Sequence, residues 1–195
     1  MIEWSLDAFR ACDSVRSIVV AAPPSHAGDL VGHADLGVVC GGDTRAQSVA
    51  NCLEAVGTEL VAIHDAARPL LTPEIVRACL EGLDEGADAA IAAARVTDTI
   101  KEGRAADPFT VDRTVDRSKL WAIQTPQVFR RDVLERALAQ PEHLLASATD
   151  DAALVEGMGG AVRLVESPRD NLKVTTPDDL RLAELLLRSR HPATD

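Results

Sequence analysis

The chain has 195 residues, of which 46% are hydrophobic but only 3% aromatic, and its formal net charge is −11. This length suits one domain with an aliphatic core, and the acidic balance argues against nucleic acid as a partner. No run approaches the roughly 20 apolar residues of a membrane span, which argues against membrane insertion.

Helices and strands are expected to alternate along the chain. Short β-rich runs predict strands at 17–22, 37–40, 59–64, 88–94 and 162–165. Helical spacing and N-terminal cap patterns predict helices over 2–12, from Thr44 to about Val56, from Thr72 to about Leu83, near 130–139 and 149–157, and from Thr176 to about Arg188.

This alternation predicts an α/β fold with a Rossmann-like, doubly wound, mostly parallel sheet in one domain over residues 1–195. Residues 96–120 are polar and weakly periodic, which indicates an extended excursion, a β-arm. The four cysteines lie at positions 12, 40, 52 and 79 and form no C-x-x-C pair. They favour ordinary buried thiols of a cytoplasmic protein over a zinc or redox site.

Two motifs follow predicted strands, at the edge where open α/β sheets bind ligands. The first is Gly41-Gly42-Asp43-Thr44-Arg45-x-x-Ser48, where glycines admit a ligand to the backbone and a helix N-terminus favours anions. Its plain alternative is a tight turn with a capping residue. The second runs from His64 to Pro69 (HDAARP), in which Asp65 suits a divalent cation and Arg68 suits a phosphate.

The HDAARP string has its own plain alternative, a turn closed by an Asp65–Arg68 salt bridge. The small pair Ala66-Ala67 leaves room for a ligand, which favours the functional interpretation. We interpret His64 as a core histidine rather than a base. Further donors and cations suited to a sugar phosphate occur in the strings DTIK (98–101), TVDR (114–117), QTPQ (124–127), TD (149–150) and DNLKV (170–174).

The motifs occur along the chain in the order GGDTRAQSV, IHDAARP, VTDTIK, TVDR, LWAIQTPQVF, ATDDAALVE and RDNLKVTTPDDL. In this order they closely resemble the 2-C-methyl-D-erythritol 4-phosphate cytidylyltransferase family, over essentially the whole chain. The resemblance implies transfer of CMP from CTP to the methylerythritol phosphate with release of pyrophosphate, in the non-mevalonate isoprenoid pathway. It also implies Mg²⁺, or another divalent cation, bridging phosphates.

Site residues carried over from this resemblance fall into three groups. The CTP group comprises Gly42, Asp43, Ser48 and Ala66. The group for the sugar-alcohol phosphate comprises Asp65, Arg68, Thr99, Thr125 and Thr149, and Asp65 is also the expected metal ligand. The catalytic pair is Arg117 and Lys173, which would position the substrate phosphate for attack. The arm, approximately residues 97–120, is expected to cross to a second subunit, so that Arg117 serves the partner's site in a homodimer.

One departure from the family is large. Members begin with a strand and a loop of the type Ala-Ala-Gly-x-Gly-x-Arg, which wraps the CTP triphosphate, and this sequence lacks both. We therefore expect Met1 to correspond to an internal methionine of a longer product. The loss of a central strand is expected to expose strand edges and apolar surface.

Three alternatives to an active methylerythritol phosphate enzyme remain at this stage. The motifs are shared with ribitol-5-phosphate cytidylyltransferase, so the sugar phosphate can differ. A catalytically inactive chain that binds substrate or dimerises is the second alternative. A purely structural α/β domain is the third, but it does not explain the ordered motifs.

Overall fold

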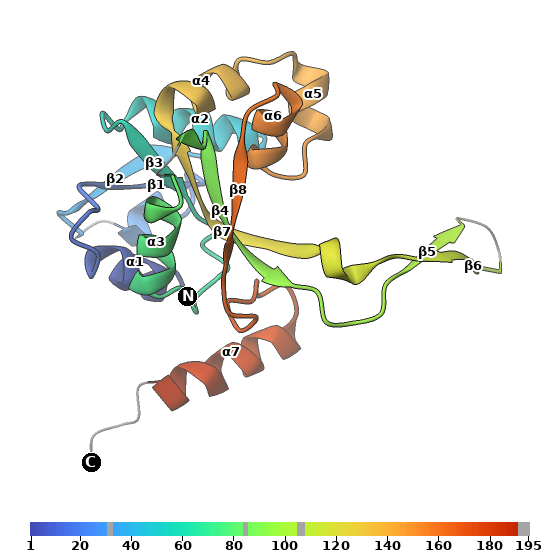
Figure 1. The fold of residues 1–195 in the computed structure, drawn as a ribbon. Helices are drawn as coiled ribbons and strands as arrows, with labels where there is room; N and C mark the ends of the chain where they lie inside the picture. The colour runs from blue at the N-terminus through green and yellow to red at the C-terminus, as the bar shows by residue number, and fades with distance from the viewer. Residues whose placement is uncertain (31–32, 84–85, 105–107, 191–195) are drawn as a thin grey trace.

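The computed structural model describes residues 1–30, 33–83, 86–104 and 108–190 (Figure 1). In chain order the elements are α1 (Ile2–Arg10), β1 (Ile18–Ala22), β2 (Leu36–Cys40), α2 (Arg45–Glu54), β3 (Leu60–Ile63), α3 (Pro73–Glu81), β4 (Ala89–Arg95), β5 (Lys101–Arg104), β6 (Thr110–Thr114), β7 (Trp121–Arg130), α4 (Arg131–Leu138), α5 (Glu142–Ser147), α6 (Asp151–Gly157), β8 (Val162–Glu166) and α7 (Pro177–Arg190). The α/β fold class is confirmed.

The strands form two separate sheets and a hairpin. β1 and β2 pair in parallel, from Ile18 opposite Leu36 to Ala22 opposite Cys40. The larger sheet has the order β3-β7-β4-β8, in which β7 is antiparallel to both neighbours and β8 is parallel to β4. Within the described residues no strand pair joins β1 to β3, so the expected single sheet is divided there.

Helices cover both faces of the sheets. On one face, α1 and α3 pack against β4 and β7 through Phe9, Val76 and Cys79. On the other face, α2, α4 and α6 bury Leu53, Leu134 and their aliphatic neighbours. This layering explains why the aliphatic run of β4 is buried from Ala89 to Ala94, since a strand covered on both faces needs apolar side chains on both.

Most predicted elements are confirmed to within a few residues. The capping box of α2 is present, with Thr44 Oγ1 accepting from Gln47 N at 3.1 Å and Gln47 Oε1 accepting from Thr44 N at 3.2 Å. At α7, Asp179 N donates to Thr176 Oγ1 at 3.2 Å, as a cap requires. At α3, Thr72 occupies the cap position without a side-chain cap hydrogen bond, and Pro73 opens the helix as predicted.

Two elements were not anticipated. β7 lies between β3 and β4 and contains Pro126, which a central strand normally excludes because proline cannot donate to the ladder. The ladder is irregular there: Ile91 opposes Gln127, whereas Ala93 opposes Ile123, so residues 124–126 are the bulged part. The short helix α5 was also missed.

The predicted β-arm is present as the β5–β6 hairpin, which extends away from the body of the molecule (Figure 1). All residues of both strands are exposed. At the base of the arm the Arg95 guanidinium lies 4.4 Å from the ring centroid of Trp121, a cation–π contact. Among the described helices, none is long and apolar enough to cross a membrane.

Candidate active site

The centre of the site is Asp65, which follows β3 at its carboxyl end. Three cations surround its carboxylate: Lys173 Nζ lies 3.0 Å from Oδ2, Arg68 Nε 3.7 Å from Oδ2, and Arg45 Nε 3.9 Å from Oδ1. Burial raises the pKa of Asp65, but the Lys173 hydrogen bond and the three positive charges outweigh it and hold the pKa below its usual value. Asp65 therefore stays ionised at neutral pH.

Arg45 connects this centre to a buried carboxylate. Its Nη1 donates to Asp151 Oδ2 at 2.6 Å, and the Asp151 side chain is almost fully buried at the start of α6. Burial raises the pKa of Asp151, while the charge and hydrogen bond of Arg45 oppose that rise. Because Arg45 opens α2 and Asp151 opens α6, this ion pair joins helices that follow different sheets.

The turn after β3 is held by a hydrogen-bond chain through His64. Nε2 faces Arg68 O at 3.3 Å, and because a carbonyl oxygen can only accept, the neutral ring carries its hydrogen on Nε2. Nδ1 then accepts from the Thr125 hydroxyl at 2.9 Å, and Thr125 Oγ1 accepts the Asp65 N–H at 3.0 Å. Burial lowers the pKa of His64 to about 4. His64 is thus a neutral positioning residue, as its core interpretation predicts.

Asn171 fastens the Lys173 loop to the same turn. Its side chain is fully buried and donates to Thr125 O at 2.9 Å and to Gln124 Oε1 at 3.2 Å. Its carbonyl accepts from Arg68 Nη1 at 2.8 Å. These bonds fix Lys173 beside Asp65, although the two residues are far apart in sequence.

A pocket of about 300 Å³ opens over these residues. Its lining combines the cations with hydroxyl, amide and carboxylate groups: Arg45, Asp65, Arg68, Ile123, Gln124, Thr125, Gln127, Thr149, Asp150 and Lys173. The structure therefore brings five expected residues together here, namely Asp65, Arg68, Thr125, Thr149 and Lys173. A cluster of arginine and lysine donors suits a phosphate group.

The glycine loop before α2 is tightly packed. A Cβ added to Gly42 would lie 2.3 Å from Gln47 Cβ, so no other residue fits without a shift. Gly42 N donates to Ser48 Oγ at 3.0 Å, and Asp43 N donates to Gln47 Oε1 at 2.8 Å. Gly42, Asp43 and Ser48 are thus brought together, and Ser48 lines a second, larger cavity that also reaches Ala66.

Two expected residues lie elsewhere. Neither Thr99 nor Arg117 lines the pocket; both are exposed, near the base of the arm. Arg117 Nη1 donates to Thr97 O at 2.5 Å. Within one chain, the structure does not bring either residue to Asp65.

Six residues that shape the site lie within the quoted motifs but were given no individual role: Arg45, Gln124, Gln127, Asp150, Asp151 and Asn171. Gln127 Nε2 donates to Asp150 Oδ2 at 2.7 Å, and Asp150 Oδ1 caps α6 by accepting from Ala153 N at 2.9 Å. The available signal was Arg45 itself, a cation placed at the first turn of a helix behind a glycine pair.

The side chains around Asp65 offer few ligands to a metal ion. In the part of the chain that the structure describes, no group of three or more His, Cys, Asp or Glu side chains is placed to hold an ion. Arg45 Nε lies 3.9 Å from Asp65 Oδ1, too far for a hydrogen bond, so this oxygen is the available protein ligand. This hard oxygen donor fits a divalent cation such as Mg²⁺, which Asp65 would hold.

The fold and this cation-lined pocket define an α/β enzyme site for phosphorylated substrates. Residues 1–189 match the family described as IspD: 2-C-methyl-D-erythritol 4-phosphate cytidylyltransferase. The chain belongs to this family, whose members are nucleotidyltransferases.

Individual relatives agree with this family. The 2-C-methyl-D-erythritol 4-phosphate cytidylyltransferase of Rubrobacter xylanophilus is 42% identical, over 95% of this chain and 82% of the relative. The bifunctional enzyme IspD/IspF of Anaeromyxobacter dehalogenans is 41% identical, over 92% of this chain and 48% of the relative. The crystal structure of the cytidylyltransferase from Thermus thermophilus has a TM-score of 0.83 and 36% identity, and covers 96% of this chain and 88% of that one.

Proposed function

We propose that this chain carries the site for transferring CMP from CTP to 2-C-methyl-D-erythritol 4-phosphate. The observation that carries the proposal is the set of three cations around Asp65 in a pocket at the carboxyl ends of the strands. In an acidic chain, such a cluster selects anionic ligands. Family membership supplies the two substrates, and the product belongs to isoprenoid biosynthesis in the cytoplasm.

The reaction needs no protein nucleophile. An oxygen of the substrate's phosphate attacks the α-phosphorus of CTP, a new P–O bond forms, and the bond to the β-phosphate bridging oxygen breaks to release pyrophosphate. The attacking phosphate is largely ionised at neutral pH, since its second pKa is about 6. No general base is required, which agrees with both nitrogens of His64 being engaged.

The side chains act by positioning and by charge. Arg68 and Lys173 are placed to hold the substrate phosphate, with Thr125 and Thr149 at the pocket wall. Lys173 is exposed enough to move from Asp65 to a ligand oxygen. Gly42, Asp43, Ser48 and Ala66 are assigned to CTP. When bound, Mg²⁺ with Asp65 as protein ligand would neutralise phosphate charge.

The arm suggests a homodimer in which each subunit completes the other's site. Phe109 is 87% exposed and Val111 63% exposed at the arm, and such apolar side chains gain from burial against a partner. Arg117 lies outside the pocket of its own chain. We assign Arg117, with Thr99, to the partner's substrate phosphate.

Turnover and binding measured in parallel test the proposal. The protein is incubated with CTP, Mg²⁺ and either methylerythritol phosphate or ribitol 5-phosphate, and the nucleotide product and pyrophosphate are quantified by ³¹P NMR. We expect product from methylerythritol phosphate. Turnover of ribitol phosphate alone would assign the other substrate. Calorimetric binding of the sugar phosphate without turnover would identify a chain that only binds substrate.

Mixed dimers test the arm. Arg117→Ala and Asp65→Ala chains, each inactive alone, are mixed after unfolding and refolding together. If Arg117 acts in the partner's site, about a quarter of the sites regain both residues, because chains pair at random. A mixture as inactive as its components would place Arg117 in the site of its own chain.

A further inference from the structure

Arg45 lies at the junction of two cavities. The pocket of about 300 Å³ is lined by the residues assigned to the sugar phosphate, and the larger cavity between β1 and β3, of about 900 Å³, reaches Ser48 and Ala66, which are assigned to CTP. Among the described residues, Arg45 and Asp65 are the two that line both cavities. Because the phosphate of one substrate must meet the α-phosphorus of the other, a residue at this junction is close to the reacting atoms.

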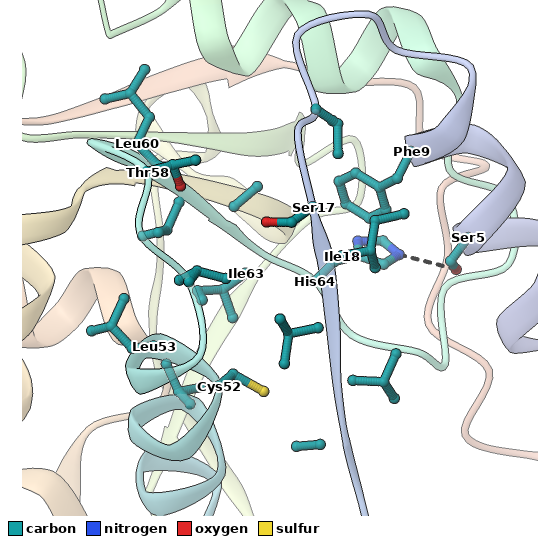
Figure 2. A pocket seen from close by; sticks show the side chains of 18 of the residues that line it. Ser5, Phe9, Ser17, Ile18, Cys52, Leu53, Thr58, Leu60, Ile63 and His64 are labelled. Carbon is teal, nitrogen blue, oxygen red and sulfur yellow. Dashed lines mark hydrogen bonds between the residues drawn. The ribbon is translucent and has the colours of Figure 1, made fainter. Parts of the chain in front are cut away.

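The larger cavity itself offers little to a phosphate. Figure 2 shows that the labelled side chains around it are largely apolar, among them Phe9, Ile18, Leu53, Leu60 and Ile63. The neutral His64 ring faces Ser5 Oγ there, with Nε2 at 3.3 Å, so it is not a cation for a ligand. Arg16 also lines the cavity but precedes β1, away from the glycine loop. The phosphates of CTP therefore belong where the cavity meets Arg45.

The Arg45 guanidinium is held at one corner and is otherwise open. Nη1 donates to Asp151 Oδ2 at 2.6 Å, and the Asp151 side chain is only 2% exposed. Nε lies 3.9 Å from Asp65 Oδ1, beyond hydrogen-bond distance. A guanidinium carries several N–H donors, so most of those of Arg45 have no partner within the described part of the chain. Since 41% of the side chain is exposed, these donors are available to a ligand in the pocket.

Asp151 fixes the direction of this guanidinium. A buried ion pair is a poor source of stability, because removing both charges from water is costly and an apolar pair of similar size often stabilises a fold at least as well. What the pair does supply is rigidity, since Arg45 opens α2 and Asp151 opens α6, so that two helices hold one cation. A charge that is already in place acts on a transition state without reorganisation.

We propose that Arg45 is a catalytic residue of the transfer reaction and that Asp151 is its positioning residue. The inference rests on the proposed function. Arg45 would donate to a nonbridging oxygen of the CTP α-phosphate and to the attacking phosphate, and so hold together two anions that otherwise repel each other. It neither gives nor takes a proton, because a guanidinium stays charged. Arg68 and Lys173 hold the sugar phosphate, whereas Arg45, which follows the glycine loop directly, links that phosphate to CTP.

NMR measures the contact without requiring turnover. The ¹⁵N–¹H signal of Arg45 Nε, assigned by its absence from the Arg45→Lys spectrum, is followed as methylerythritol phosphate or CTP is added alone. We expect it to shift with each substrate, because each brings a phosphate to this guanidinium. The control is Arg131 Nε, which donates to Glu135 on α4 and lies outside the pocket lining, so its signal should not move.

The outcomes separate this inference from the proposed function. If the amides of Thr125 and Thr149 shift with the sugar phosphate while Arg45 Nε does not, the inference is overturned and the proposed function stands. If no pocket signal shifts with either substrate, the proposed function fails and the inference with it. A shift of Arg45 Nε with only one of the two substrates would overturn the bridging role.

A double variant separates catalysis from folding. Arg45→Met with Asp151→Leu replaces the buried ion pair by apolar side chains, which keeps the fold. We expect turnover at saturating substrates to fall at least about 100-fold, and the Kd of the sugar phosphate to rise less than about tenfold, because the contact strengthens in the transition state. Arg136→Met removes an exposed cation of α4 and should change neither quantity. Unchanged turnover in the double variant would overturn the catalytic role.

Free guanidinium distinguishes a catalytic guanidinium from a structural one. Arg45→Ala keeps the Asp151 carboxylate, which can hold a guanidinium ion from solution. We expect guanidinium chloride, below the concentrations that unfold the protein, to raise the turnover of Arg45→Ala at least about tenfold, and sodium chloride at equal ionic strength to have no such effect. Arg45→Ala with Asp151→Leu should not be rescued. Equal rescue of both variants would remove Asp151 from its positioning role, and a folded Arg45→Ala that is not rescued would overturn the inference.

Discussion

The two sheets are built from similar aliphatic sequences but differ in burial. In the larger sheet, β4 has strands on both edges, and its six residues from Ala89 to Ala94 are buried. In the smaller sheet, β1 has a partner on one edge, and four of its five residues are only partly buried. The burial of a strand therefore depends on its neighbours. An aliphatic composition indicates only that the strand is suited to a buried environment.

The candidate site lies where these two regions meet. Arg45 and the glycine loop follow the smaller sheet, whereas Asp65, Thr125 and Lys173 belong to segments of the larger one. Variants on each side of this boundary separate what each region contributes, and the largest effect is expected on turnover.

Lys173 belongs to the region of the larger sheet and is expected to act on charge in the reaction. In an enzyme that turns over CTP and the sugar phosphate, Lys173→Ala should lower turnover about 100-fold, the loss typical of one donor to developing charge. The urea midpoint should change little, because the side chain is 47% exposed. Lys173→Arg is the control that keeps the charge. Unchanged turnover of the alanine variant would remove Lys173 from the chemistry.

Arg45 tests the connection between the two regions. Arg45→Met leaves the buried Asp151 carboxylate without its cation, and we expect a loss of about 3 kcal/mol in the free energy of unfolding. Arg45→Lys keeps the charge and should lose less than half as much. Urea denaturation at pH 7 measures both. Equal stability of the methionine variant and the parent would show that the Arg45–Asp151 pair does not stabilise the fold.

One substitution in both sheets tests the difference in burial directly. Val128 in β7 is fully buried, whereas Val20 in β1 is half-buried and lines the cavity between β1 and β3. Val128→Ala should lower the free energy of unfolding by about 2–3 kcal/mol, because it leaves a cavity in the core. Val20→Ala should lower it by less than about 1 kcal/mol. Chemical denaturation of the two variants gives the comparison. Similar costs would mean that the smaller sheet is packed as well as the larger.

His64 makes stability depend on pH. Its pKa falls from 6.5 to about 4 in the folded chain, so the unfolded chain binds more protons between those values. The contribution of His64 to the free energy of unfolding is complete above about pH 6.5 and is lost as the pH falls towards 4. We expect a loss of about 2 kcal/mol, less than the full pKa shift implies, because solvent in the cavity beside the ring screens the charge. His64→Gln should remove this dependence, while His143→Gln, at an exposed position, should not. Identical pH profiles of the two variants would contradict the assignment.

The sequence predicted the elements whose signals are local. The Thr44–Gln47 capping box and the aliphatic runs at 18–22 and 89–94 each depend on a few adjacent residues, and the structure confirms them. β7 was missed because Pro126 and its polar neighbours are atypical of a central strand. They are tolerated at a bulge, and the bulge depends on the partner strand.

Like the fold, the site was predictable only where its contacts join residues that are close in sequence. Asp65 and Arg68 share one turn, so their proximity follows from the sequence itself. The Arg45–Asp151 pair spans 106 positions and the Arg68–Asn171 bond spans 103, so both depend on how the sheets are arranged. Exposed strand edges were expected from the missing family strand, but their place between β1 and β3, and the cavity there that reaches Arg45 and Asp65, required the structure.

The scarcity of aromatic residues makes the molecule simple to observe by spectroscopy. The sequence contains two tryptophans and no tyrosine. Trp121 lies under the Arg95 guanidinium at the base of the arm, and Trp4 lies 39% exposed on α1, a helix that lines the cavity between β1 and β3. Replacing Trp4 by phenylalanine leaves an emission spectrum that reports on the arm alone, and replacing Trp121 leaves one that reports on α1. Intrinsic fluorescence can thus follow docking of the arm and changes around α1 as separate signals, without an added dye.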